Sequence, residues 1–407
     1  MTSKPVNLPN KTIFNMQTQP FKNNSSLQPA LLLLITALLA LACAPAFASG
    51  GTFTWNGGGA DGNWTTAGNW GGTAPSDPQN FLNFNGATRT ASTNNFGAGS
   101  PGYQIYFKNG ANAFNLYGNS IFFYDFGGGV NDPNIQNEGA NTNQTINFPI
   151  ANGNNNGAFH ILNINVNTGT SQGPLTFNGT VSSADAGQAL RVVNVYGPSA
   201  VAFNGIISDF DSTHKLALSQ LGSGTMTLTA TNTFTGDMTV NAGTLVLATN
   251  SALANSGNFI RLGDTAGSTG ANLNLNGGNN ISTPINVRSG SSGGKIIANT
   301  SGSAGPAAFG GSLFLDADVT LFANSTGGNI LSGSTLDLKN QTLTIDGTGS
   351  NVISGTLQQS TGNGKLVKNN TGTLYMSAAS SHTGGTTSMR VSFRSTAAAH
   401  SAPATSP

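Results

Sequence analysis

The sequence is poor in charged residues. Asp, Glu, Lys and Arg together make up 7% of its 407 residues, and the formal net charge is +1. A protein that binds nucleic acid neutralises phosphates with clustered cations, whereas the 15 Lys and Arg residues are scattered along this chain. We therefore expect no nucleic-acid partner.

Motifs that hold metals, phosphates or cofactors are also missing. The four histidines, His160, His214, His382 and His400, do not have the spacing that metal ligands show. The 55 glycines form no phosphate-binding loop, and we interpret their clusters as turns. We expect neither a metal nor a cofactor in this protein.

Long apolar runs are absent except near the N-terminus. The run at residues 30–42 is too short for a helix that spans a bilayer, which takes about 20 residues. The small residues of Ala46-Phe47-Ala48 predict signal-peptide cleavage after Ala48, and lipidation of Cys43 is the alternative. We expect secretion and no transmembrane helix in the mature chain. Because Cys43 is the only cysteine, cleavage would leave no disulfide to stabilise the fold.

Short alternating runs are abundant instead. Residues 224–248 read GTMTLTATNTFTGDMTVNAGTLVLA, in which Met226 and Leu228 alternate with Thr, and Leu245 and Leu247 alternate with Thr and Val. Period-2 runs broken by Asn and Gly predict half-buried strands joined by tight turns. Three such strands in this one short segment, with no helical spacing between them, predict one coil of a solenoid.

The pattern returns at constant offsets. Gly372-Thr373-Leu374 matches Gly224-Thr225-Met226 at an offset of 148 (372 − 224), and residues 175–183 match residues 201–209 at an offset of 26 (201 − 175). Fixed periods of this size predict a stacked architecture. We expect a right-handed parallel β-helix in which residues 50–387 form about 15 coils of about 22 residues.

Residues 224–248 resemble the autotransporter-associated β-strand repeat. The residues that carry the resemblance are Gly224, Thr225, Leu228, Asn232, Phe234, Gly236, Gly243 and Leu245. A second, partial copy occupies residues 372–387. The resemblance implies a passenger-type β-helix protein that a Gram-negative bacterium secretes or displays at its surface. It also implies no enzymatic activity, because that repeat carries no known chemistry.

The function that we expect from this resemblance is structural. Such a passenger would contribute to adhesion, to a surface layer or to the extracellular matrix, with surface glycans or other cell-surface proteins as partners. Two alternatives from other classes stay open. One is a carbohydrate-active β-helix enzyme, and the other is a glycan-binding module.

The glycan-binding alternative depends on the tryptophans. All three, Trp55, Trp64 and Trp70, lie in one block at the start of the expected β-helix. A solenoid needs a cap, because its first coil would otherwise expose both its core and a strand edge. We interpret the block as this cap. Alternatively, the indoles form a platform that stacks on sugars, which makes the three residues candidates for binding.

The enzyme alternative depends on paired carboxylates, which can act as acid and base or hold a metal. Asp209 and Asp211 lie in the densest cluster of ionisable residues, DFDSTHK at residues 209–215. Two Asp separated by one residue on a strand share a face. A second pair, Asp316 and Asp318, has no His, Lys or Arg close to it in the sequence. We interpret residues 209–215 as a solvated loop and expect no catalytic residue.

The chain is therefore expected to have five parts. We predict a signal peptide at residues 1–48, a Trp-rich cap with the first coils at residues 49–141, and β-helix modules at residues 142–248 and 249–387. Residues 388–407 contain no Gly and no Asn, so we expect a disordered or aberrant tail there. We expect neither a translocator barrel nor a sorting helix in this sequence as written, which leaves the mode of surface attachment open.

Overall fold

The structure of the protein is a computed structural model. The residues that it describes are 51–76, 80–102, 104–125, 133–139, 142–154, 160–165, 172–184, 189–250, 253, 259–299, 305–324, 328–333, 335–388 and 393–395. The predicted signal peptide, its cleavage site after Ala48 and the alternative lipidation site at Cys43 lie outside the described residues.

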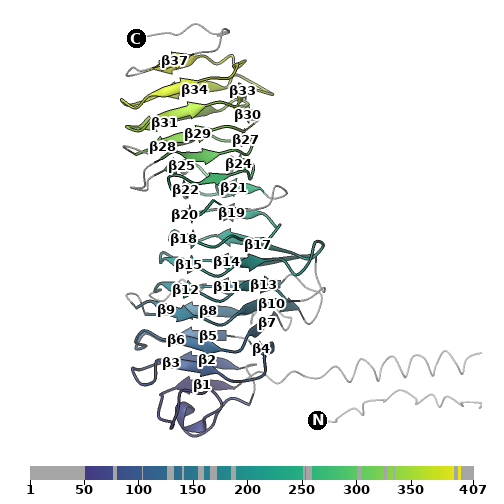
Figure 1. Cartoon of the computed structure of the whole chain (residues 1–407), viewed down its shortest axis with the longest axis vertical. Coiled ribbons are helices and arrows are strands. Elements are labelled where there is room, and N and C mark those ends of the chain that lie inside the picture. Colours follow the sequence, from purple (N-terminus) through teal and green to yellow (C-terminus); the bar gives the residue numbers. More distant parts are fainter. Residues whose placement is uncertain are drawn as a thin grey trace, which may run out of the picture. The chain divides into compact units, whose positions relative to one another are not determined.

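Two 13-stranded parallel sheets run through the described stack (Figure 1). In spatial order, sheet A contains β1 (Thr52–Trp55), β2 (Phe81–Phe84), β5 (Gln104–Phe107), β8 (Asn134–Asn137), β11 (His160–Ile164), β14 (Leu190–Val195), β17 (Lys215–Gln220), β19 (Met238–Val240), β21 (Ile260–Leu262), β24 (Ile285–Val287), β27 (Leu313–Leu315), β30 (Thr335–Asp337) and β33 (Thr356–Gln358). Sheet B contains β3 (Ala91–Asn94), β6 (Asn115–Gly118), β9 (Gln144–Ile146), β12 (Leu175–Phe177), β15 (Val201–Phe203), β18 (Thr225–Leu228), β20 (Gly243–Leu247), β22 (Ala271–Leu275), β25 (Lys295–Asn299), β28 (Val319–Ala323), β31 (Thr342–Gly347), β34 (Lys365–Lys368) and β36 (Thr386–Ser388).

Two shorter sheets take the third position in the coils. Sheet C contains β4 (Ser100–Gly102), β7 (Ile121–Asp125), β10 (Ile150–Asn154), β13 (Val181–Ser183) and β16 (Ile207–Ser208). Sheet D contains β23 (Asn280–Ile281), β26 (Ala307–Phe309), β29 (Asn329–Leu331), β32 (Asn351–Ile353), β35 (Leu374–Met376) and β37 (Phe393–Ser395). In most coils the chain visits sheet A, then sheet B, then the third sheet, and each strand pairs in parallel with its counterpart one coil away. The predicted fold class, a parallel β-helix, is confirmed.

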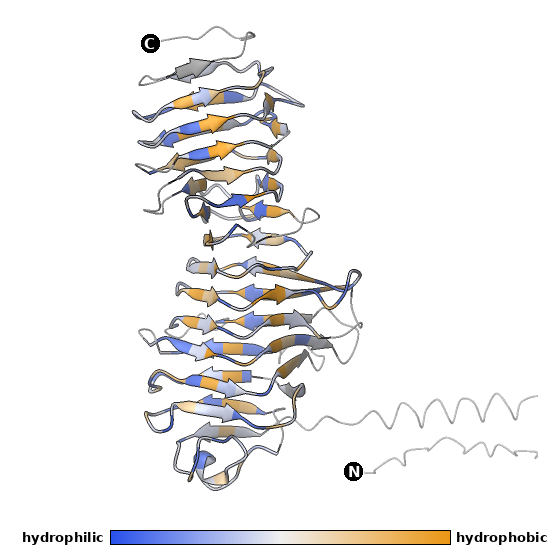
Figure 2. Cartoon of the chain, viewed as in Figure 1, coloured by the Kyte–Doolittle hydropathy of each residue, from blue (hydrophilic) through white to orange (hydrophobic). Residues whose placement is uncertain are grey.

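Alternate side chains of the strands fill the interior. In β12 and β15, for example, the first and third residues are buried and the middle residue is partly exposed. The rings of Phe177 and Phe203 stack one above the other, with centroids 5.0 Å apart and planes at 14°. Figure 2 shows the same alternation as hydrophobic and hydrophilic residues that follow one another along the strands. Since parallel strands lie about 4.8 Å apart, equal side chains on adjacent coils meet, as these two phenylalanines do.

Coil length varies more than we expected. In sheet A, one turn of the helix takes the chain from Leu218 to its partner Met238, whereas another takes it from His160 to its more distant partner Arg191. Most coils are longer than the expected repeat of about 22 residues, so sheets A and B each contain 13 strands in the described residues, where we expected about 15 coils. The longer of these two turns contains β13, a strand of sheet C, whereas the shorter turn contains no strand of a third sheet.

The expected single coil at residues 224–248 is also wrong. Its three strands exist as β18, β19 and β20, but β18 and β20 both lie in sheet B and pair through Met226 and Leu245. The segment therefore contains more than one coil, because one full turn already ends where Leu245 meets Met226. Period-2 alternation identified the strands, but it carries no information on which sheet each strand joins.

The C-terminal segment departs from the expected disorder in part. Ser388 ends β36, and residues 393–395 form β37, which continues sheet D beside β35. Residues 389–392 and 396–407 lie outside the described residues. A second predicted boundary, at residues 248 and 249, is crossed by both long sheets, because β20 pairs with β22 and β19 with β21 across it.

Candidate functional site: the coils of the two repeats

The Trp block closes the first coil. Trp55 and Trp64 are 0% exposed and Trp70 is 6% exposed. The rings of Trp55 and Trp70 meet edge to face, with centroids 5.1 Å apart, and that of Trp64 lies 5.4 Å from the ring of Phe84. Edge-to-face aromatic packing stabilises a core beyond the area that it buries. This arrangement agrees with a cap.

Hydrogen bonds hold the indoles in these positions. Nε1 of Trp64 donates to Oγ of Ser92 at 3.2 Å, and Nε1 of Trp70 donates to the carbonyl of Trp64 at 2.6 Å. Trp70 ends the short 3₁₀ helix η1 (Ala67–Trp70). Because the rings are buried, the structure offers no indole face on which a sugar could stack. The burial of Trp55, Trp64 and Trp70 favours the cap over a sugar-binding platform, which stays a prediction.

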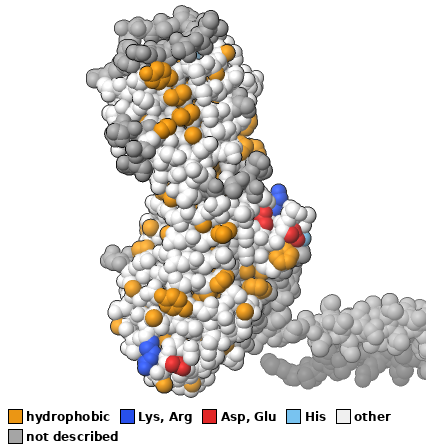
Figure 3. Space-filling view, viewed as in Figure 1, with side chains coloured by type: hydrophobic (Ala, Val, Ile, Leu, Met, Phe, Trp, Pro, Cys, Tyr) orange, Lys and Arg blue, Asp and Glu red, His pale blue; other side chains and the backbone are white. Residues whose placement is uncertain are grey.

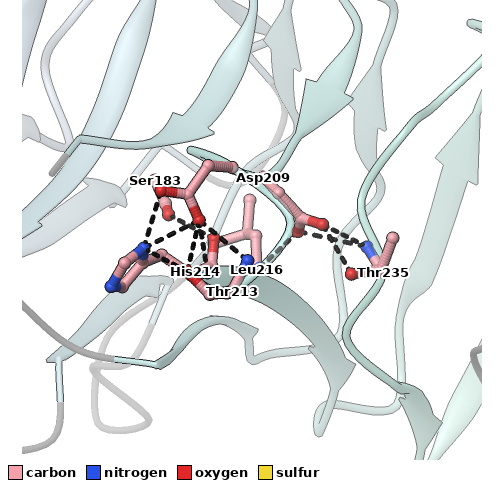
Figure 4. A network of polar contacts seen from close by, with 7 residues as sticks. Ser183, Asp209, Thr213, His214, Leu216 and Thr235 are labelled. Atoms are coloured by element: carbon pink, nitrogen blue, oxygen red, sulfur yellow. Dashed lines mark hydrogen bonds and ion pairs between the residues drawn. The ribbon is translucent and has the colours of Figure 1, made fainter. Parts of the chain in front are cut away.

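Residues 209–214 of the cluster form the loop between β16 and β17, Lys215 begins β17, and the two carboxylates make different contacts (Figure 4). Asp211 is exposed and accepts hydrogen bonds from the backbone N–H and Oγ1 of Thr213, each at 2.8 Å, and from Nδ1 of His214 at 2.7 Å. The bonds from Thr213, followed by those from His214, hold the pKa of Asp211 well below its usual value. A general acid needs a raised pKa, so Asp211 does not suit that role.

Asp209 is half-buried and connects two coils. Its Oδ1 accepts the backbone N–H of Leu216 at 2.6 Å. Its Oδ2 accepts the backbone N–H of Thr235 at 2.9 Å and the Thr235 hydroxyl at 2.6 Å. Both carboxylate oxygens are thus engaged by protein donors, and Figure 4 shows Asp209 between Leu216 and Thr235. We call this arrangement the coil clamp.

The second carboxylate pair is also structural. Asp316 pairs with Nζ of Lys339, which the next coil supplies from 23 residues further along the chain. Burial raises the pKa of Asp316, but hydrogen bonds from Lys339 and Asn286 and the charge of Lys339 outweigh it, and the net pKa is lowered. Asp318 accepts the backbone N–H of Thr342 at 2.7 Å. The cation that we did not find near Asp316 in the sequence is therefore present in space.

The glycines of the first repeat's signature lie at points where its coils come close together. An added Cβ on Gly224 would lie 2.2 Å from the carbonyl oxygen of Ser199, and one on Gly236 would lie 2.4 Å from that of Leu216. Gly243 has a φ of +69°, in the left-handed region that favours glycine. These three glycines are required by close backbone approach or by a positive φ.

The remaining signature residues divide between interior and turn. Leu228, Phe234 and Leu245 are buried in the core, whereas Thr225 is partly exposed on the outer face of β18. Asn232 is buried, and its Oδ1 accepts the backbone N–H of Ile207 at 2.8 Å. Its Nδ2 donates to the carbonyl of Ala230 at 3.2 Å. Asn232 thus uses its amide to attach the turn to the preceding coil.

The second repeat contains the same coil clamp with a different side chain. The carbonyl oxygen Oε1 of Gln359 accepts the backbone N–H groups of Gly364 and Thr383, each at 2.9 Å. Gly364 and Thr383 follow Leu216 and Thr235 at the repeat offset of 148 (364 − 216 and 383 − 235). Nε2 of Gln359 donates to Oγ1 of Thr383 at 2.5 Å. An amide therefore replaces the carboxylate, and the hydroxyl of Thr383 accepts where that of Thr235 donates.

The buried ring of the repeat also changes between the copies. His382 follows Phe234 at the same offset of 148 (382 − 234) and is 3% exposed. Its Nδ1 contacts Oγ of Ser380, and its Nε2 contacts Oγ1 of Thr386 at 3.0 Å. Ser380 and Thr386 stand where the first repeat has Asn232 and Met238. The second copy therefore provides polar partners for a polar ring in the interior.

No metal centre and no membrane-spanning helix appear in the described part of the chain. Among these residues, no group of three or more His, Cys, Asp or Glu is placed to bind a metal ion. Within the same residues, no helix has the length and apolar character needed to cross a membrane. The coil clamps are a polar arrangement that the two repeats share, and sequence reasoning missed them because Asp209 and Gln359 belong to the preceding coil.

Comparison with known families also finds two repeats in the chain. The model of the Passenger-associated-transport-repeat family matches residues 218–247 and 366–387. These are repeats of the autotransporter passenger kind, as the resemblance implied, and they indicate a secreted or surface-displayed passenger. The two matched segments contain Thr235 and Thr383, whereas their clamp partners Asp209 and Gln359 lie outside them. No curated protein and no solved structure matches the chain.

Proposed function

We propose that this protein is a structural passenger that works at the bacterial cell surface, in adhesion, in a surface layer or in the extracellular matrix. The observation that carries the proposal is that both matched repeats are coils of one continuous parallel β-helix. A stack of this kind presents long faces on which weak contacts can be repeated from coil to coil. Surface glycans and other cell-surface proteins are the partners that we propose.

The character of the outer surface supports a structural role. Few charged side chains appear on the face in Figure 3, where most of the surface is backbone or uncharged polar side chain. Beside sheet B, Asn178 donates to Asn147 at 2.8 Å, and Asn204 donates to Asn178 at 2.9 Å, so exposed amides form a ladder across adjacent coils. Such ladders satisfy polar groups at the outside of stacked strands.

The contacts of the paired carboxylates, on which the enzyme alternative depends, favour a structural role over catalysis. Asp209 uses both oxygens to join two coils, Asp211 has a lowered pKa, and Asp316 pairs with Lys339. A general acid requires a raised pKa and a free oxygen, whereas the pKa values of Asp211 and Asp316 are lowered and both oxygens of Asp209 are engaged. We therefore propose a non-catalytic protein.

Localisation in the producing bacterium tests the proposal. Antibodies raised against the purified protein should label intact cells or recover the protein from the medium, and protease added outside the cells should remove the cell-bound label. A cytoplasmic protein probed in parallel should stay protected, which shows that the cells are intact. Detection in the cytoplasmic fraction alone would contradict the proposal. Reduced attachment of a deletion strain to glycan-coated or cell-coated surfaces would then identify adhesion.

A further inference from the structure

The third side of the β-helix is interrupted between sheets C and D. Sheet C ends with β16 and sheet D begins with β23, while sheets A and B continue between them through β17 to β22. Among the described residues from 209 to 279, no strand belongs to a third sheet. In Figure 1, the level of β19 and β20 carries strands of sheets A and B only.

Side chains take over part of the backbone ladder where sheet C ends, and the N–H of Thr233 still donates to the carbonyl of Ile207 at 2.9 Å. One coil earlier, the N–H of Val181 donates to the backbone carbonyl of Ile206 at 2.9 Å. At the end of the sheet, the N–H of Ile207 donates instead to the side chain of Asn232. The clamp between Asp209 and Thr235 lies beside this contact. The repeat therefore covers the edge of β16 that another chain could otherwise extend.

The ladder in sheet A also narrows at this level, and it stays at three paired residues or fewer in the coils that follow. Strand β17 pairs with β14 along its whole length, from Lys215 to Gln220, but with β19 only from Leu218 to Gln220. Strand β19 in turn pairs with β21 only from Met238 to Val240. Each coil of a repeat protein contacts only its neighbours, so stability is a sum over these interfaces and cooperativity breaks at the weakest one.

We propose that the first repeat is a joint that divides the β-helix into two cooperatively folding units. The first unit ends with β16 and the second begins with β21. Asp209 and Asn232 set how strongly the two units are coupled, because they make the side-chain contacts that stand in for the missing third sheet. This proposal does not depend on where the protein is displayed.

The distribution of aromatic residues supplies a probe for one unit. All three tryptophans lie at residues 55–70, in the cap of the first unit, and the only tyrosine after residue 196 is Tyr375. Tryptophan fluorescence therefore reports unfolding of the first unit alone, whereas far-ultraviolet circular dichroism reports both units. Coincidence of two such probes is the standard test of two-state unfolding.

The experiment is an equilibrium unfolding titration of the full chain in guanidinium chloride, followed by both signals. We expect transitions that do not coincide, with midpoints about 0.5 M or more apart. The double variant Asp209→Ala/Asn232→Ala should widen the gap. Hydrogen exchange of the unaltered protein should likewise give two protection levels, which change between β17 and β21.

The matched control is Gln359→Ala, which removes the clamp of the second repeat. There, sheet A is the sheet that ends, with β33 directly before Gln359, while sheets B and D continue through β34 to β37, so this clamp lies at a separate sheet end within the second unit. This variant should leave the midpoint of the fluorescence transition unchanged. Any change in the difference between the two midpoints should come only from the lower stability of the second unit. Coincident curves and a single protection level in the unaltered protein would overturn the proposal, whether or not the double variant folds.

Discussion

The hydroxyl of Thr235 donates to the carboxylate of Asp209 at 2.6 Å, although 26 residues separate them in the sequence. The equivalent pair in the second repeat is Thr383 and Gln359, which 24 residues separate. Both threonines sit at the same place in the Thr-Gly dipeptide of the repeat. The Thr of this dipeptide is thus explained by a contact with the preceding coil, and the Gly by the approach of a backbone carbonyl.

Asp209→Ala should destabilise the protein by about 2–3 kcal/mol, because hydrogen bonds to a charged acceptor are worth about 1.5–3 kcal/mol and three donors lose their partner. Asp209→Asn should cost about 1 kcal/mol, since an amide oxygen accepts the same N–H groups in the second repeat. Midpoints of chemical unfolding measure both. The control is Asp211→Ala, which removes exposed contacts within one loop and should cost less. Equal losses for Asp209→Ala and Asp211→Ala would contradict the clamp.

Phe234→His should destabilise the protein by about 2–4 kcal/mol, because it buries a polar ring where the second partner is missing. In the second repeat Nε2 of His382 contacts Thr386, but the first repeat has Met238 at that position, and a thioether is a weak acceptor. The reverse change, His382→Phe, should cost about 1 kcal/mol, for the lost partner of Thr386. Thermal unfolding of the two variants compares them directly, and a larger loss for His382→Phe would contradict this account.

Local patterns of the sequence predicted much of the fold. Alternation identified Met226, Leu228, Leu245 and Leu247 as inward residues, and all four are buried. Offsets of constant length predicted the stack, because a single short repeat cannot bury its apolar face without a neighbour. The Trp block was interpreted as a cap for the same reason, and its burial agrees with that interpretation.

The register between coils could not be predicted from the sequence. Coils of sheet A differ widely in length, and this length depends on loops that carry no periodic signal. The contacts of Asp209 with Thr235 and of Asp316 with Lys339 both depend on that register. Polar residues at inward positions were missed as well. Gln220, for example, continues a buried row of sheet A, and its Nε2 donates to the carbonyl of Gly222 at 2.7 Å.

Gly236→Ala should destabilise the protein by about 2 kcal/mol or more, because the new Cβ would lie 2.4 Å from the carbonyl oxygen of Leu216 and force two coils apart. Gly294→Ala is the matched control, since a Cβ there meets no atom within 4 Å. Replacing a glycine in open space should be neutral or should stabilise by up to about 1 kcal/mol, through the lower entropy of the unfolded chain. Similar midpoints for the two variants would show that coil spacing is not tight at Gly236.

Acid should weaken the second half of the β-helix through Asp337. Burial raises the pKa of this carboxyl, but hydrogen bonds from Ser360, at 2.9 Å from its N–H and 2.7 Å from Oγ, and from the N–H of Lys339 outweigh burial, so the net pKa is lowered. A carboxyl with a lowered pKa in the folded state stabilises the fold above its unfolded pKa of about 3.9. That contribution is lost as the pH falls through the folded pKa.

The unfolding midpoint should therefore be flat above about pH 5 and fall below about pH 4. Asp337→Asn should lower the midpoint at neutral pH, because its Nδ2 cannot accept the Ser360 hydroxyl, and should reduce the slope in acid, because the titrating group is gone. Circular dichroism titrations at a series of pH values measure both effects. Asp318→Asn is the comparison at neutral pH, since Asp318 accepts a single backbone N–H, which the amide oxygen can also accept, so its midpoint should fall less. An unchanged slope in Asp337→Asn would assign the acid sensitivity to other carboxylates.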